Sequence, residues 1–184
     1  MDAMQTDKLY TYEDYLTWDD DARYEIIDGV AYAHAAPSTA HQRISGEVFR
    51  QLANFLRDKP CNVFPAPYAV RLHTVEGKDS VVEPDILVVC DKTKIDDQGC
   101  TGAPDLIIEI LSSSTAAYDM VIKFNTYLQA GVREYWIVDP DSRIVNVYVL
   151  KDGEYITHAY AQTDTVAVHV LERCTITLAD VFAI

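Results

Sequence analysis

The chain has 184 residues, which is enough for one domain with a buried core, and its 49% hydrophobic and 24% charged residues are typical of a globular protein. No apolar run approaches the roughly 18 residues that a membrane span needs, and the acidic N-terminus lacks the layout of a secretory signal. Fibrous, disordered and membrane classes are thereby excluded. A cytoplasmic protein is expected.

The net charge of −14 bears on nucleic-acid binding, because a basic face supplies most of the nonspecific affinity of a protein for phosphates. Much of the excess is local. Residues 1–30 contain nine acidic and two basic residues, a net charge of −7. The remaining surface can therefore still present a basic groove.

The four cysteines form no CxxC motif and no Cys/His cluster at zinc spacing, so no structural zinc is predicted. Since no signal peptide precedes them, we expect reduced thiols rather than disulfides. The cysteines are Cys61, Cys90, Cys100 and Cys174.

The N-terminal third predicts a short helix, a hairpin and a longer helix. The first helix covers Tyr12–Trp18, and Asp28-Gly29 between two β-forming runs is a two-residue hairpin signal. The longer helix can be capped by Ser38 or Thr39, and its apolar residues recur at spacings of three and four. These apolar residues are Ile44, Val48, Leu52 and Phe55.

The rest of the chain alternates strand-like runs with one helix that ends at Gly131, a common residue at helix C-termini. The runs cover residues 62–72, 81–89, 105–111, 134–139, 143–150, 154–160, 166–170 and 174–178, and the helix covers about 116–130. This order predicts a single α/β domain, 1–184, with a mixed central sheet flanked by helices. The N-terminal helix and hairpin, residues 1–36, would extend that core, and the late hairpins would extend the sheet or form a small second one.

Two acidic residues lie inside otherwise apolar strand runs. Asp85 follows Pro84 among valines and isoleucines, and Glu109 stands between Ile108 and Ile110. A buried carboxylate is costly unless it is paired, protonated or bound to a metal. If the two strands are neighbours, both acids can bind one Mg²⁺, whose other ligands are water and phosphate oxygens. Alternatively, Asp85 ends a strand and caps a turn, and Glu109 lies on a solvent-facing edge.

Three further features leave a functional and a structural interpretation open. Asp119, Lys123 and Tyr127 are four residues apart and share a helix face, so Lys123 either pairs with Asp119 at the surface or points toward Glu109. His41, at the start of the long helix, can be a cap, a phosphate contact or a ligand. Ser112–Ser114 are better explained as helix caps than as nucleophiles, since no G-x-S-x-G elbow is present.

An ordered set of motifs resembles the Uma-two family of restriction endonucleases, within the PD-(D/E)XK nuclease superfamily. The motifs are V-E-P-D-I-L-V-V-C-D (Val82–Asp91), G-A-P-D-L-I-I-E-I-L-S (Gly102–Ser112), D-x-x-x-K-x-x-x-Y (Asp119, Lys123, Tyr127) and G-V-R-E-Y-W-I-V-D-P (Gly131–Pro140), with Y-E-I-I-D-G (Tyr24–Gly29) and P-S-T-A-H (Pro37–His41) before them. The resemblance covers nearly the whole chain.

This resemblance implies a restriction-endonuclease-like fold and a set of site residues. Asp85 and Glu109 would bind Mg²⁺ or Mn²⁺ together with the backbone carbonyl of Ile110. The superfamily lysine is expected two residues after the glutamate, where this chain has Leu111, and Lys123 resembles a displaced equivalent. Glu25 and His41 match recurring family positions and are second-tier candidates.

The function implied by the resemblance is Mg²⁺-dependent hydrolysis of DNA phosphodiester bonds by an endonuclease, expected to act as a homodimer. The acidic charge and Leu111 motivate an alternative, a catalytically inactive nuclease fold that serves as an interaction or dimerisation module. A third possibility is a metal-assisted hydrolase of another anionic phosphate.

Overall fold

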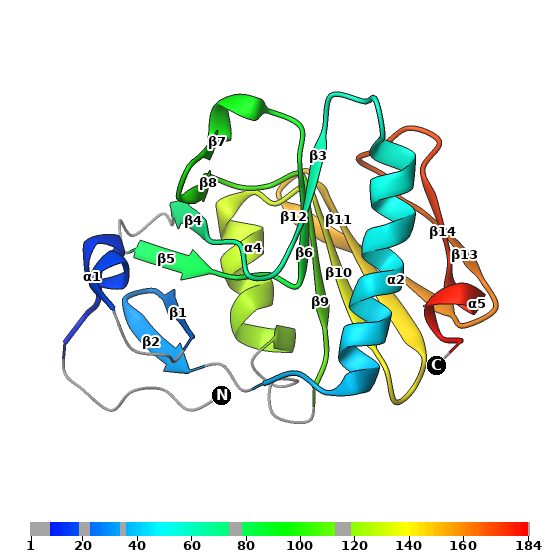
Figure 1. Ribbon diagram of the computed structural model, residues 1–184, viewed down its shortest axis with the longest axis horizontal. Helices are drawn as coiled ribbons and strands as arrows, with labels where there is room; N and C mark the ends of the chain where they lie inside the picture. The colour runs from blue at the N-terminus through cyan, green and yellow to red at the C-terminus, as the bar shows by residue number, and fades with distance from the viewer. Residues whose placement is uncertain (1–7, 19–22, 34–35, 74–78, 113–118, 184) are drawn as a thin grey trace.

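The computed structural model describes residues 8–18, 23–33, 36–73, 79–112 and 119–183 (Figure 1). Its helical segments are α1 (Tyr12–Thr17), α2 (Thr39–Leu56), the short 3-10 helix η1 (Lys92–Lys94), the π-helical η2 (Asp119–Lys123), α4 (Phe124–Ala130) and α5 (Leu178–Val181). Within the described residues, none of the helices has both the length and the apolar character that crossing a membrane requires.

The central sheet has six strands in the order β12-β11-β10-β9-β6-β3. Their bounds are β3 (Asn62–Pro65), β6 (Ile86–Val89), β9 (Leu106–Ile110), β10 (Glu134–Asp139), β11 (Ile144–Lys151) and β12 (Glu154–Ala161). β9 and β10 run parallel, and the other neighbouring pairs run antiparallel. The expected mixed sheet is present, and the hairpin β11–β12 extends it.

A second six-stranded sheet, which the sequence did not predict, has the order β2-β1-β5-β4-β8-β7. Its strands are β1 (Tyr24–Ile27), β2 (Val30–Ala33), β4 (Val70–His73), β5 (Asp79–Val82), β7 (Ile95–Asp96) and β8 (Gly99–Thr101). A separate two-stranded sheet pairs β13 (Thr165–Ala167) with β14 (Thr175–Thr177). The N-terminal hairpin is therefore one edge of a larger sheet.

The apolar residues form two layers on opposite faces of the central sheet. On one face, α2, α5 and the β13–β14 pair pack against alternate residues of the strands, among them Ile86, Ile108 and Trp136. On the other face, Leu87, Ile107 and their neighbours pack against α4 and the second sheet. By the two-residue period of a strand, Glu109 shares the face of Ile107. It therefore lies in the layer between the central sheet and α4.

Several local predictions are confirmed. Asp28 and Gly29 both have positive φ, 49° and 80°, as a tight turn between β1 and β2 requires. The side chain of Ser38 accepts a hydrogen bond from the backbone N–H of His41 and so caps α2. Gly131 ends α4 in the left-handed conformation, with φ 81°. The predicted start of this helix, residues 116–118, lies outside the described residues.

Two predicted strands are each divided between the two sheets. Residues 62–72 form β3, which ends at Pro65, and β4, with Pro67 between them. Residues 81–89 form β5 and β6, with Pro84 between them. Proline lacks the N–H that a ladder needs, so it favours a strand end at these points. The break at Pro84 moves the chain from the second sheet to the central sheet. Asp85 is thereby placed at the start of β6.

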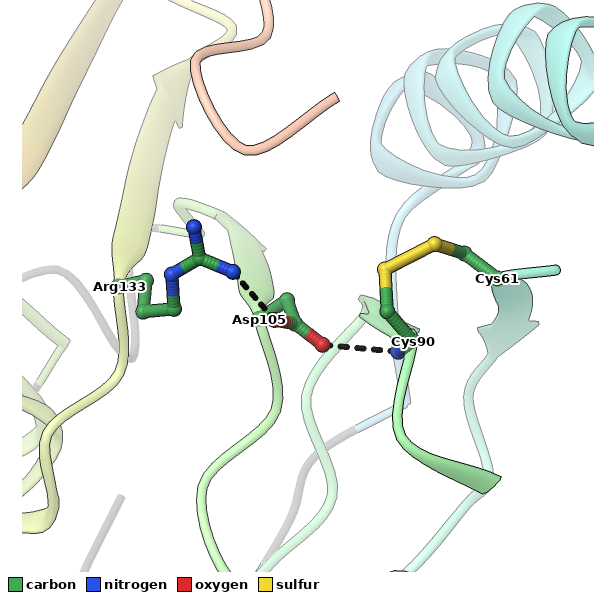
Figure 2. The surroundings of a disulfide bond; sticks show 4 residues. All are labelled: Cys61, Cys90, Asp105 and Arg133. Carbon is green, nitrogen blue, oxygen red and sulfur yellow. Dashed lines mark hydrogen bonds and ion pairs between the residues drawn. A yellow bond between two sulfur atoms is a disulfide. The ribbon is translucent and has the colours of Figure 1, made fainter. Parts of the chain in front are cut away.

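The expectation of reduced thiols is wrong for one pair of cysteines, because Cys61 and Cys90 form a disulfide (Figure 2). Cys61 directly precedes β3 and Cys90 directly follows β6, and the pairing of Asn62 with Val89 brings the two cysteines together. This proximity comes from strand pairing across 29 residues, so no local motif signals it. Beside it, Asp105 accepts hydrogen bonds from the Cys90 backbone N–H and from Arg133, both at 2.8 Å (Figure 2).

Candidate functional site

Asp85 and Glu109 come together where β6 begins and β9 ends. Antiparallel β6 and β9 pair Ile86 with Ile108, and continuing this register by one residue sets Asp85 opposite Glu109. The Asp85 side chain reaches β9, since its Oδ2 accepts a hydrogen bond from the backbone N–H of Ile110 at 2.8 Å. Two acids that are 24 positions apart in sequence are therefore neighbours in the fold.

Glu109 is nearly inaccessible to solvent, with 3% of its surface exposed. One of its carboxylate oxygens, Oε1, accepts hydrogen bonds from Lys123 Nζ at 2.8 Å and from the Tyr127 hydroxyl at 2.7 Å. Both donors come from the segment η2–α4, which covers this face of the central sheet. The solvent-facing position that the sequence left open for Glu109 is therefore excluded.

Lys123 lies at the end of η2 and is 1% exposed. Its Nζ is 2.8 Å from Glu109 Oε1 and 3.0 Å from Glu25 Oε1, so the ammonium group lies between two carboxylates. This contradicts a purely surface-exposed lysine. The side chain of Asp119, its other possible partner, lies outside the described residues.

Glu25 enters the site from β1 of the second sheet and is fully buried. Besides Lys123, its Oε1 binds the backbone N–H of Glu83 at 2.7 Å. Glu83 is two residues before Asp85, so Glu25 also fixes the chain segment that leads to Asp85. Contacts therefore run from Glu109 through Lys123 and Glu25 to this segment and link the two sheets.

His41 approaches Asp85 from the N-terminus of α2. The imidazole is buried, and its Nε2 is 3.0 Å from Asp85 Oδ2. The Ser38 cap fixes the backbone at this position, because it accepts the N–H of His41 itself. The contact with Asp85 is none of the three roles left open for His41, and the cap of α2 is Ser38.

The electrostatics of this cluster favour an additional cation. Two buried carboxylates, Glu25 and Glu109, face one buried ammonium group, and Asp85 adds a third acid nearby. Desolvation disfavours excess negative charge, so a cation at this position would stabilise the acids in their ionised form. The pKa of Tyr127 is raised well above its ordinary value, first by burial and then by the charge of Glu109, so its hydroxyl remains a donor.

The donor set suits a hard divalent cation with few protein ligands. Among the described residues, no group of three His, Cys, Asp or Glu side chains is arranged to hold a metal. Mg²⁺ commonly binds through one or two carboxylates and keeps water and phosphate oxygens as its other ligands. Asp85 and Glu109, opposite each other, fit this pattern of two carboxylates.

Glu134 shows that a buried acid alone does not make a site. It accepts hydrogen bonds from Trp136 Nε1 at 2.7 Å and from the Val170 backbone N–H at 2.8 Å, and burial raises its pKa. These neutral donors satisfy it in a structural position. Glu109 differs, because a lysine and a second acid surround it.

The structure brings together all of the residues singled out from the sequence: Asp85, Glu109, Ile110, Lys123, Glu25 and His41. Leu111, at the usual place of the superfamily lysine, packs instead against the apolar layer beside α4. The sequence did not assign a role to Tyr127. Its spacing of four residues from Lys123 was the available signal, since it places both side chains on one helix face.

Comparisons with known proteins identify the family and the fold. Residues 12–179 match the model of the Uma2 family, described as "Putative restriction endonuclease". Two uncharacterised proteins from Synechocystis are similar: slr1290 is 28% identical over 83% of this chain and 80% of its own length, and sll1609 is 30% identical over 76% and 80%.

A solved structure from Anabaena variabilis, titled a "putative nuclease belonging to DUF820", has the same fold. Its TM-score is 0.77 at 21% sequence identity, over 94% of this chain and 97% of that one. The family model covers most of this chain, and the fold matches that of the Anabaena protein over nearly its whole length. This chain belongs to the Uma2 family of restriction-endonuclease-like proteins.

Proposed function

We propose that this protein is a metal-dependent endonuclease that hydrolyses phosphodiester bonds of DNA, with Asp85, Glu109 and Lys123 as its catalytic residues. The observation that carries the proposal is the buried contact of Lys123 with Glu109, next to Asp85 on the neighbouring strand. Buried charged groups held this close together cluster at functional sites, which favours a catalytic role for this lysine. The nuclease family of the chain supports the same reaction class.

Asp85, Glu109 and the backbone carbonyl of Ile110 would hold Mg²⁺ or Mn²⁺. Such an ion, when bound, polarises a phosphoryl oxygen and lowers the pKa of a coordinated water. The ammonium group of Lys123 would stabilise negative charge that develops on the phosphate or orient the attacking water. Glu25 would keep Lys123 in place through the 3.0 Å contact.

The net charge of −14 opposes DNA binding, so the bound cation and local basic side chains must offset this repulsion. A homodimer belongs to the same proposal, because a two-fold enzyme places one site on each strand of a duplex. In the described part of the chain, β12 pairs with β11 alone and offers an outer edge for a second copy. Sedimentation velocity at several protein concentrations measures the oligomeric state.

The decisive experiment measures cleavage of plasmid DNA with Mg²⁺ or Mn²⁺ by the wild type, Asp85→Asn and Glu109→Gln. Both substitutions keep the side-chain size and remove one charge. We expect cleavage to fall by at least about 100-fold, while circular dichroism spectra stay unchanged. Cleavage that persists in both variants would show that these acids are not catalytic.

Asp105→Asn is the matched control, because Asp105 also follows a proline but lies at the opposite end of β9, next to Cys90 and Arg133. It should keep the wild-type cleavage rate. If the wild type neither cleaves DNA nor binds Mn²⁺ by calorimetry, the inactive interaction module is the better account. Cleavage of small phosphodiesters without cleavage of DNA would favour the third hypothesis.

A further inference from the structure

A single oxygen of Glu109 receives two donors from one helical segment. Tyr127 donates its hydroxyl to Oε1 at 2.7 Å, and Lys123 donates Nζ to the same atom at 2.8 Å. The two donors are four residues apart, one turn of helix. The proposed reaction uses Lys123 and Glu109 but gives Tyr127 no part.

The Tyr127 hydroxyl is held rigidly. The side chain is fully buried in the apolar layer between the central sheet and α4, and its ring packs edge-on against Tyr135 at 5.0 Å between centroids. A buried aromatic ring in a packed layer has few alternative rotamers. Its hydroxyl therefore defines a fixed point to which the Glu109 carboxylate must turn.

We propose that Tyr127 is a positioning residue, which holds the Glu109 carboxylate in one orientation for the cation that Asp85 and Glu109 bind. This inference rests on the proposed function. Tyr127 itself contacts Glu109 rather than the substrate, so its effect is exerted through that carboxylate.

The geometry of the contacts supports this role. The hydrogen bonds from Tyr127 and Lys123 both end on Oε1, so they fix one oxygen of the Glu109 carboxylate and with it the orientation of the group. Glu109 is buried, so little water can compete for these contacts. Groups that orient a metal ligand in this way commonly contribute 10–100-fold to metal affinity.

The test compares Tyr127→Phe with Tyr155→Phe. Each variant loses only a hydroxyl, and Tyr155 borders the same apolar layer but donates to the Val132 carbonyl at 2.9 Å. Calorimetric titration with Mn²⁺ measures the affinity of each protein. We expect Tyr127→Phe to weaken Mn²⁺ binding about tenfold and Tyr155→Phe to leave it unchanged, with similar small losses of thermal stability in both.

This comparison gives a readout that a merely structural role would not move, because both variants lose one hydroxyl and only Tyr127→Phe loses a contact with Glu109. Equal Mn²⁺ affinities in Tyr127→Phe and the wild type would overturn the inference. The proposed nuclease function would be untouched by that result.

A measurement without metal separates the two proposals. NMR relaxation of a ¹³C-labelled Glu109 side chain in metal-free protein should show lower order in Tyr127→Phe than in the wild type. If that loss of order occurs but the wild type binds no Mn²⁺, the proposed metal site fails and the Tyr127–Glu109 coupling stands. Unchanged order removes the coupling itself.

Discussion

Lys123 and Glu109 form a buried ion pair of 2.8 Å, although 14 residues separate them in the chain. In the superfamily pattern, the lysine stands two residues after the glutamate, where this chain has Leu111 directly after β9. Here the cation comes from the segment that crosses back over the sheet toward β10. The ammonium group beside Glu109 thus comes from η2 rather than from the chain directly after β9.

Lys123→Met should destabilise the protein in a pH-dependent manner. Removing the lysine leaves Glu25 and Glu109 buried without their cation, which typically costs about 3–5 kcal/mol at neutral pH. Protonation removes the charge that burial penalises, so the loss of stability should be smaller at low pH than at neutral pH.

Urea unfolding at pH 5 and pH 8 measures this effect for Lys123→Met. Lys59→Met is the control, since Lys59 is exposed and lies over the ring of Phe55. It should change the free energy of unfolding little, and equally at both pH values. An equal loss for Lys123→Met at both pH values would mean that the two acids are not left uncompensated.

His41→Ala should weaken Mn²⁺ binding. The imidazole contacts Asp85 Oδ2 at 3.0 Å, and without it this carboxylate keeps one fewer group that fixes its orientation. We expect the dissociation constant to rise about tenfold. Gln42→Ala, an exposed change in the same helical turn, provides the comparison in calorimetry. Similar Mn²⁺ affinities for the two variants would remove His41 from the site.

The elements predicted correctly from the sequence depend on local signals. Asp28-Gly29 specifies a tight turn by itself, and the run Glu134–Asp139 is apolar, bounded by Pro140, and forms β10 as predicted. The family resemblance added the pairing of Asp85 with Glu109, which periodicity left open. The turn and the strand need no knowledge of distant partners, whereas the family resemblance carries that knowledge for the two acids.

The features that were missed depend on which distant segments meet. Residues 81–89 form two strands because the segments that pair with them belong to different sheets. β5 pairs with β4 before Pro84, and β6 pairs with β9 after it. The contact of Glu25 with Lys123 joins residues 98 positions apart, and the Cys61–Cys90 disulfide follows from the pairing of β3 with β6. No local pattern carries that information.

The thiol count of the protein should reflect one disulfide and two buried thiols. Burial raises the pKa of Cys100 and of Cys174 to about 11, so roughly one thiol in a thousand is ionised at pH 8. The folded protein should therefore react slowly with Ellman's reagent. After unfolding without reductant, two thiols should react, and after reduction four.

The double variant Cys61→Ser, Cys90→Ser is the control for this count, because it should give two thiols with or without reductant. Four reactive thiols in the unfolded, unreduced wild type would contradict the disulfide. Comparing the double variant with the wild type also measures how much the disulfide stabilises the fold. Closing a loop of 29 residues is worth about 3–4 kcal/mol in the chain-entropy model, and urea unfolding of the double variant tests that value.

Ser38→Ala should weaken α2 at the end that bears His41. The Ser38 side chain accepts the backbone N–H of His41 at 3.1 Å, and loss of such a cap costs about 1 kcal/mol. Thr39→Ala, one residue later and inside the helix, is the matched control and should cost less, since alanine has the higher helix propensity. Urea unfolding compares the stabilities of the two variants.

Because the N–H that Ser38 accepts belongs to His41, which contacts Asp85, we expect Ser38→Ala also to weaken Mn²⁺ binding, by less than His41→Ala. A stability loss with unchanged Mn²⁺ affinity would show that the orientation of His41 does not depend on the cap.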